Sequence, residues 1–184
     1  MERNIFGIWF LKMVFDKKFY MDEFERLLNE RKENKFYIRK SDSSFKIRFF
    51  IKKGIGGFEL ANYVKNSRQA AKDYWVIIIS YYSMLYMAKA AILTKGFETD
   101  DHYSTQIALG RLMVPDEIEK EDLELLNQAY KVFEEDYIAY FEDARKESST
   151  SRYSATKIYT ERRVDEIFEN ARKFIAKLKV ILRE

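Results

Sequence analysis

The chain has 184 residues, of which 47% are hydrophobic and 34% are charged, with a formal net charge of +3. This length supports one domain with its own core, and the composition excludes a largely disordered chain. The chain contains no cysteine and one histidine, which excludes disulfides, thiol nucleophiles, cysteine-based zinc sites and multi-histidine metal sites, so we expect no metal and no cofactor.

The chain begins with an apolar segment, "MERNIFGIWFLKMVF", that contains Lys12 and lacks a small-residue cleavage site. It therefore does not have the pattern of a signal peptide. Residues 21–34 have the spacing of a short amphipathic helix, with Phe24, Leu27 and Leu28 on one side.

Residues 45–52 alternate apolar and basic side chains, as a strand does. A helix that begins at Ser43 or Ser44 fits this segment equally well. The glycines of "KKGIGG", residues 52–57, predict a turn that breaks any helix there. We expect residues 1–55 to form an N-terminal extension that packs on the main domain. This extension is expected to be helical and could include a short hairpin.

Five further helical patterns follow the glycine-rich segment. With one proline and six glycines in the whole chain, long helices are favoured over a barrel or sandwich. We expect an all-α, up-and-down antiparallel helical bundle over residues 56–184. The predicted helices cover residues 58–72, 73–93, 100–113 (with Asp100 or Asp101 as the cap), 116–146 and 160–182.

The predicted helix at residues 73–93 is apolar on nearly all sides. It is long enough to raise the question of a membrane helix. Lys89 within it, and tyrosines at its middle instead of its ends, favour a buried core helix. We therefore expect no membrane association and, given the absence of cysteine, a cytoplasmic protein.

Two common nucleotide and hydrolase motifs are missing. "KKGIGG" has neither the spacing nor the Lys-Ser/Thr end of a phosphate-binding loop, and the chain contains no Gly-x-Ser-x-Gly nucleophile motif. Candidate chemistry therefore depends on individual side chains.

The first candidate is Lys95 with His102. A lysine can hold a phosphate and a histidine can move a proton near neutral pH, so the pair could cleave RNA without metal. The alternative is that His102 is a structural residue in the first turn of a helix, next to Asp100 and Asp101.

The second candidate is the polar segment "ARKESSTSRYSATK". Arg145, Arg152 and Tyr153 could bind phosphate and stack a base, or the segment could simply connect two helices. The third candidate is the group Tyr81, Tyr82 and Tyr86, whose helical spacing is more typical of a core or a dimer interface.

Two separate blocks of the chain resemble HEPN domains, over roughly residues 58–182. The first block is "YWVIIISYYSMLYMAKAAILTKGFETDDH" and the second is "RYSATKIYTERRVDEIFENARKFIAKLKVIL". The residues that carry the resemblance are Tyr81, Tyr82, Met84, Tyr86, Ala88, Ala91, Ile92, Leu93, Lys95, Gly96 and His102, followed by Tyr153 and residues 171–175.

The resemblance implies an up-and-down helical bundle that forms a homodimer. It also implies a minimal nucleotidyltransferase as a partner, often in a toxin–antitoxin pair. Catalytic members carry an Arg-x(4–6)-His ribonuclease motif, which lies later in the chain than the Lys-Gly and His block. Here Lys95, and not an arginine, precedes His102 at that spacing, and no histidine follows Arg145.

Three hypotheses follow from these observations. The leading one is a HEPN-like protein, non-catalytic or degenerate, that binds RNA, a nucleotide or a nucleotidyltransferase through the loop with Arg145 and Arg152 and through its basic chain ends. The second is a metal-independent ribonuclease that uses His102 with Lys95 or Arg145. The third is a purely structural, dimeric interaction module.

Overall fold

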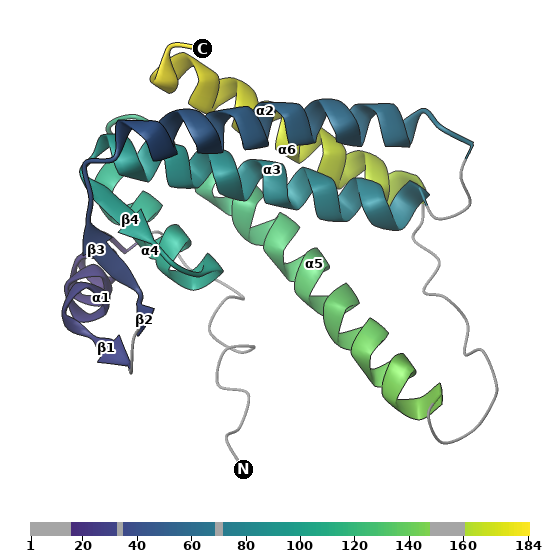
Figure 1. The fold of residues 1–184 in the computed structure, drawn as a ribbon, viewed down its shortest axis with the longest axis horizontal. Helices are drawn as coiled ribbons and strands as arrows, with labels where there is room; N and C mark the ends of the chain where they lie inside the picture. Colours follow the sequence, from purple (N-terminus) through teal and green to yellow (C-terminus); the bar gives the residue numbers. More distant parts are fainter. Residues whose placement is uncertain (1–15, 33–34, 69–71, 148–160) are drawn as a thin grey trace.

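A computed structural model describes residues 16–32, 35–68, 72–147 and 161–184. It is an all-α helical bundle with two short two-stranded sheets at one end (Figure 1). The elements are α1 (Lys17–Asn29), β1 (Arg31–Lys32), β2 (Lys35–Phe36), β3 (Ile38–Lys40), α2 (Ser44–Lys65), α3 (Lys72–Thr94), β4 (Phe97–Thr99), α4 (His102–Met113), α5 (Lys120–Glu147) and α6 (Glu161–Leu182).

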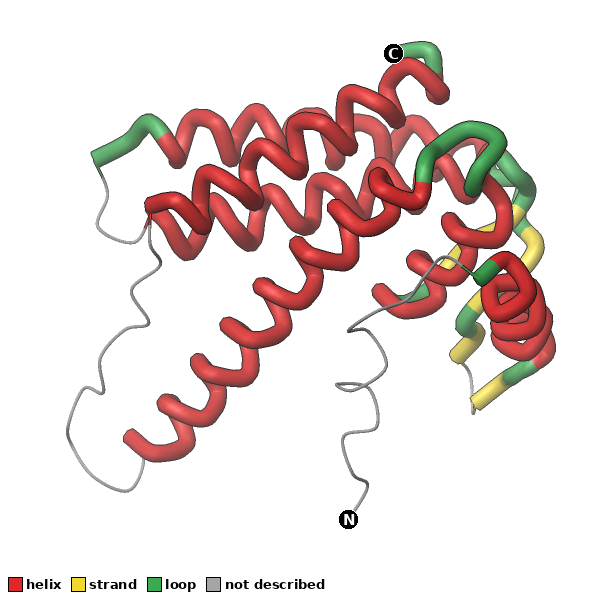
Figure 2. The backbone as a smooth tube through the Cα atoms, turned by 180° about the vertical axis from the view of Figure 1, so that it is seen from behind, coloured by secondary structure: helices red, strands yellow, loops and turns green. Residues whose placement is uncertain are grey.

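The bundle consists of α2, α3, α5 and α6, which run alternately up and down, as predicted (Figure 1). Figure 2 shows α6 packed along α2 and α3, while the C-terminal half of α5 diverges from the other three helices. Helix α6 begins and ends within one residue of its predicted bounds, because its apolar side chains recur every three or four residues.

Helix α3 is the centre of the core. By length and composition it could cross a membrane, but most of its apolar stretch is buried inside the bundle. It contacts α2, α4, α5 and α6. Burial on several sides explains why its sequence is apolar nearly all round.

Helix α2 decides between the two alternatives for residues 45–52 and corrects one expectation. Residues 45–51 are helical and not a strand, because Ser43 caps the helix by accepting a hydrogen bond from the Lys46 amide at 3.4 Å. The predicted break at residues 52–57 is wrong, since α2 continues through it. The predicted domain boundary between residues 55 and 56 thus falls inside a continuous helix.

Glycine at position 54 brings α2 close to α3. A Cβ atom there would lie 2.6 Å from Cγ of Met87 and 3.1 Å from the Ser83 carbonyl oxygen. A glycine inside a helix costs roughly 1 kcal/mol relative to alanine. Here the cost is offset by helix packing that no larger residue would permit, which the local sequence pattern does not reveal.

Helix α4 begins at His102, directly after Asp101, one of the two predicted cap residues. The Asp101 side chain accepts from the Ser104 amide at 2.7 Å, and the Ser104 hydroxyl accepts from the Asp101 amide at 3.2 Å, which completes a capping box.

Helix α5 begins at Lys120, later than the predicted residue 116. The Glu117 amide donates to the Met113 carbonyl at 2.8 Å, so this segment forms a turn at the end of α4.

The N-terminal region packs on α4 and β4. Helix α1 begins at Lys17, where the Asp16 carboxylate accepts from the Lys18 amide at 2.9 Å, and contacts α4. Strands β1 and β2 form a small hairpin, and β3 pairs antiparallel with β4. The pairing of β3 with β4 joins residues about sixty positions apart in the chain.

Candidate functional site

His102 is the first residue of α4, directly after its capping aspartate. This position aims its ring at the neighbouring helices α3 and α5. The Tyr81 hydroxyl is hydrogen bonded to Nδ1 of His102. The imidazole also stacks on Tyr130, with ring centroids 5.2 Å apart, and on Tyr81, at 5.4 Å.

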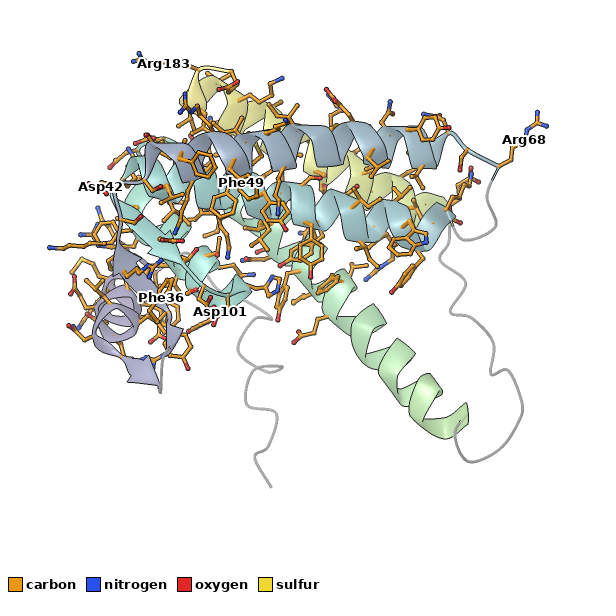
Figure 3. The ribbon with its side chains drawn as sticks, viewed as in Figure 1. Phe36, Asp42, Phe49, Arg68, Asp101 and Arg183 are labelled. Atoms are coloured by element: carbon orange, nitrogen blue, oxygen red, sulfur yellow. The ribbon has the colours of Figure 1, made fainter. Side chains whose placement is uncertain are left out.

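His102 belongs to a continuous series of aromatic rings that crosses four helices. We call this series the aromatic row: Phe50 of α2, Tyr86 and Tyr82 of α3, His102 of α4, and Tyr130 and Phe133 of α5. Every member is partly exposed. Figure 3 labels Phe49, next to one end of the row, and Asp101, next to His102.

Successive rings of the aromatic row are close enough to touch. The centroid distances are 5.8 Å from Phe50 to Tyr86, 6.3 Å from Tyr86 to Tyr82, and 6.2 Å from Tyr82 to His102. Phe133 lies 5.4 Å from Tyr82 and completes the α5 side. Partly exposed aromatic rings can contact a flat ligand such as a nucleobase.

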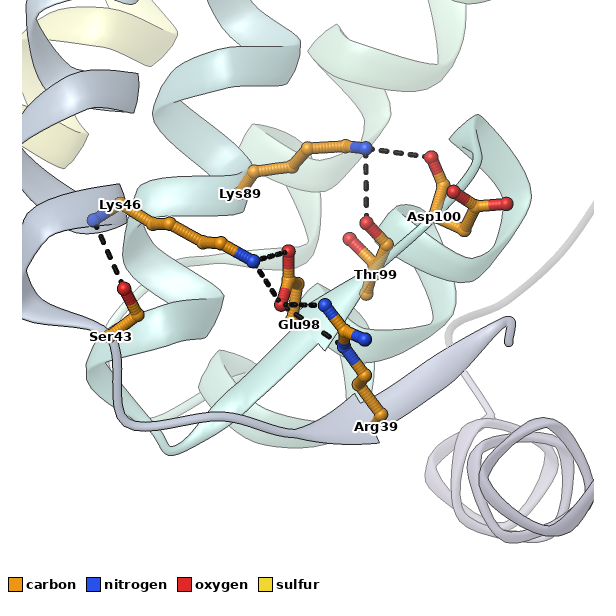
Figure 4. A network of polar contacts seen from close by, with 7 residues as sticks. All are labelled: Arg39, Ser43, Lys46, Lys89, Glu98, Thr99 and Asp100. Atoms are coloured by element: carbon orange, nitrogen blue, oxygen red, sulfur yellow. Dashed lines mark hydrogen bonds and ion pairs between the residues drawn. The ribbon is translucent and has the colours of Figure 1, made fainter. Parts of the chain in front are cut away.

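Two lysines accompany the row. The Lys53 amino group lies 4.9 Å from the centroid of the Tyr86 ring and 4.6 Å from that of Phe49. The Lys89 amino group donates to the carbonyl oxygens of Thr99 at 3.1 Å and Asp100 at 2.8 Å (Figure 4). Lys89 thereby holds the backbone that leads into α4 and places a positive charge near His102.

The electrostatics favour a neutral imidazole. Burial lowers the pKa of His102 below its ordinary value of 6.5, the Lys89 charge lowers it further, and only Asp101 acts in the opposite direction. Burial also raises the pKa of the Tyr81 hydroxyl far above its ordinary range. The pair is therefore uncharged near neutral pH, and His102 can accept and donate hydrogen bonds without carrying charge.

A separate ion cluster is centred on Glu98 (Figure 4). Glu98 of β4 accepts from Lys46 of α2 at 2.7 Å and from Arg39 of β3 at 2.9 Å. These contacts tie the N-terminal region to the bundle. Within the described residues, no group of three or more histidine, aspartate or glutamate side chains is arranged to hold a metal ion.

The structure does not bring Lys95 and His102 together. Lys95 pairs with Glu117 at the end of α3. Lys95 directly follows Thr94, the last residue of α3, whereas Tyr81, the partner of His102, lies thirteen residues before Thr94, which corresponds to about 20 Å along the helix axis. The spacing that placed Lys95 before His102 in the sequence therefore does not produce a composite site within one chain.

The other predicted residues fall into two groups. Tyr81 is a core residue with 1% of its surface exposed, whereas Tyr82 and Tyr86 are partly exposed members of the aromatic row. Arg145 lies in α5, at a position whose side chain is not described, and Arg152 and Tyr153 lie outside the described residues.

Sequence reasoning missed the roles of Lys89, Phe50 and Tyr130 in this site. Lys89 lies seven residues after Tyr82, on the same face of α3, so helical spacing was a usable signal for it. Phe50 and Tyr130 come from other helices, and no local pattern connects them to His102.

A family model of the HEPN domain matches residues 57–181, which is more than half of the chain. The chain belongs to the HEPN domain family. The matched range of this HEPN domain includes His102 and every member of the aromatic row except Phe50. No curated protein sequence gives a significant match.

Proposed function

We propose that this HEPN domain binds RNA or a nucleotide and does not cleave it. The observation that carries the proposal is the aromatic row, whose partly exposed rings are flanked by Lys53 and Lys89. Bases stack on such rings whatever their sequence, and nearby lysines attract phosphate. We therefore expect a ligand with at least one unpaired base.

The state of His102 supports binding over cleavage. A ribonuclease of the family type needs an arginine with its histidine, and residues 95–97, at the corresponding spacing before His102, are Lys, Gly and Phe. Nδ1 of the imidazole is also already hydrogen bonded to the Tyr81 hydroxyl. A neutral histidine in this position can contact a bound base or sugar by stacking or by its remaining ring nitrogen.

The test is fluorescence anisotropy with a labelled single-stranded RNA and with labelled nucleotides. Tyr82→Ala should weaken binding by about 1–3 kcal/mol, or roughly 5- to 150-fold, because it removes a stacking ring. Tyr82→Phe keeps the ring and should bind nearly as well as the wild type. Trp75→Ala, an exposed aromatic of α3 outside the row, is the matched control.

The same protein is then incubated with RNA in EDTA. We expect no cleavage by the wild type. Cleavage that disappears in His102→Gln would contradict the proposal and establish the metal-independent ribonuclease. Absence of binding to every RNA and nucleotide probe would contradict it in favour of a structural module.

A nucleotidyltransferase remains the expected protein partner, as an implication of the family. Co-purification of the tagged chain with the product of a neighbouring gene tests this part separately, because it does not depend on RNA binding. A toxin–antitoxin role would require that the two products neutralise each other's effect on growth.

A further inference from the structure

The outer face of α2 carries a line of apolar side chains that the bundle does not cover. The spacing of their positions keeps them within about one sixth of the helix circumference. Gly54 and Ala61 are buried on the opposite side of α2, which packs on α3. We call the exposed line the outer stripe: Phe45, Phe49, Leu60 and Tyr63, which are 69%, 44%, 50% and 75% exposed, respectively.

Basic side chains flank the outer stripe on both sides in the first half of α2. By their helical positions, Arg48 and Lys52 lie on one side of it. Lys46 and Lys53 lie on the other side. Residues 43–58 contain no acidic residue. The first half of this face is therefore both apolar and positively charged.

Most of this positive charge is not neutralised by the chain itself. Lys46 pairs with Glu98. Among the described residues, however, no ion pair joins Arg48, Lys52 or Lys53 to a carboxylate. All three of these side chains are exposed. A partner that covers this face should therefore offer both apolar surface and negative charge.

The outer stripe is a ridge on a single helix and not a groove between elements. All four of its side chains come from α2, and each of them is exposed. A partner helix docks in a groove, whereas a ridge of aromatic and aliphatic side chains can enter the interface of a lipid bilayer. In that position the stems of lysine and arginine extend along the apolar surface, and their charged ends reach the headgroups.

We propose that the outer stripe of α2 binds the surface of an anionic lipid bilayer, with Arg48, Lys52 and Lys53 at the headgroups. The contact is peripheral, because α3, the described helix that is apolar enough to cross a membrane, is mostly buried inside the bundle. The expectation of no membrane association is thereby narrowed to membrane-spanning helices. The outer stripe shares no residue with the aromatic row, so the proposal does not depend on RNA binding.

The test is sedimentation of the full chain with lipid vesicles, after nuclease treatment has removed bound nucleic acid. Vesicles of equimolar phosphatidylcholine and phosphatidylserine should bind the protein at least about tenfold more tightly than vesicles of phosphatidylcholine alone. Added salt should weaken this binding, because it screens the charges. Equal binding to the two vesicles, or no binding to either, would overturn the proposal.

Charge reversal on the flank of the outer stripe locates the contact. Each basic side chain near an anionic surface strengthens binding by about fivefold, so Lys52→Glu should weaken it by about tenfold or more. The matched control is Arg162→Glu, the same change in net charge at an exposed position of α6, near the Lys65–Asp165 pair at the other end of α2. Equal losses in the two variants would show that net charge alone attracts the protein to lipid, which would overturn the proposed site.

The double substitution Phe45→Ala and Phe49→Ala tests the apolar part of the contact. It should weaken binding to the anionic vesicles by about tenfold or more, because both rings leave the interface. Trp75→Ala removes an exposed aromatic ring of α3 outside the outer stripe and should bind like the wild type. A double variant that binds as tightly as the wild type would overturn the proposal.

Because the chain contains no cysteine, one introduced cysteine can place an environment-sensitive dye on this face. Gly56 lies within the arc of the outer stripe, and a Cβ atom there would meet nothing within 4 Å. On anionic vesicles, the emission of a dye at Gly56→Cys should shift to shorter wavelength. A dye at Asn62→Cys, exposed about 120° around α2, should shift less.

Equal shifts at the two positions would overturn the proposal. A dye at Gly56→Cys whose emission is already shifted without vesicles would also overturn it, because the protein itself would then cover the outer stripe.

Discussion

At the scale of single residues, the surroundings of His102 decide what it can do. Its place as the first residue of α4 follows from the Asp101 cap, which is local. Its contacts with Tyr81 and Tyr130 come from two other helices. Burial among these rings and the Lys89 charge lower its pKa, so the residue that looked most suited to proton transfer is held neutral.

This predicts the titration of the only imidazole in the chain. Nuclear magnetic resonance should show a His102 pKa below 6.5, while a peptide of residues 97–107 should titrate near its ordinary value. As the pH falls, His102 is protonated in the unfolded state before it is protonated in the folded state. Its contribution to the free energy of unfolding is therefore fully present above pH 6.5 and decreases as the pH falls toward the folded pKa. His102→Gln should lack this loss, and a measured pKa at or above 6.5 would contradict the prediction.

At the scale of elements, α2 shows how packing overrides a local signal. Three glycines in four residues predict a break, yet the helix runs from Ser44 to Lys65. Gly54 is required by the close approach of Met87. The start of α5 shows a different limit, because Pro115 and the acids after it resemble a helix start but form a turn on the end of α4.

The substitution Gly54→Ala distinguishes helix propensity from helix packing, because the two change the stability in opposite directions. Helix propensity alone predicts a gain of about 1 kcal/mol, whereas the collision with Met87 and the Ser83 carbonyl predicts a loss of about 1–3 kcal/mol. We expect a net decrease in the free energy of unfolding, measured by urea denaturation. In a Met87→Ala background the added methyl group has room, so the same substitution should cost less. A stabilised Gly54→Ala protein would show that α2 and α3 can move apart.

At the scale of the whole molecule, Glu98 joins three parts of the chain. It links β4 to Arg39 of β3 and to Lys46 of α2, beside the β3–β4 pairing. Its side chain is 12% exposed, whereas those of its two partners are 48% and 37% exposed. Burial raises the pKa of Glu98, but the hydrogen bonds from Lys46 and Arg39, together with the positive charges of both side chains, lower it by more, so the carboxylate stays ionised.

Glu98→Gln should therefore lower the free energy of unfolding at pH 7 by about 1–3 kcal/mol, since it weakens two charged hydrogen bonds. The matched control is Glu169→Gln, which breaks an exposed pair with Arg172 and should cost at most about 1 kcal/mol. Because the folded pKa of Glu98 is lowered, its contribution is present above the unfolded pKa and is lost as the pH falls through the folded value. Equal losses in the two variants would contradict this role.

The sequence by itself determined the helical class, the family and several helix ends. The apolar period of α6 and the cap of α4 act through neighbours a few residues away, so local patterns contain them. The resemblance to HEPN domains likewise depends on residue types at fixed spacings, such as Tyr81, Gly96 and those of the last helix, which the sequence shows directly.

Only the tertiary structure decided which side chains meet. In the folded chain β3 pairs with β4, and α2 continues as one helix past its glycines. Lys95 and His102 lie apart, and the aromatic row is formed by side chains from four helices. Such contacts depend on how helices rotate and approach one another, which is set by the packing of the whole core. A pattern read along one helix does not contain that information.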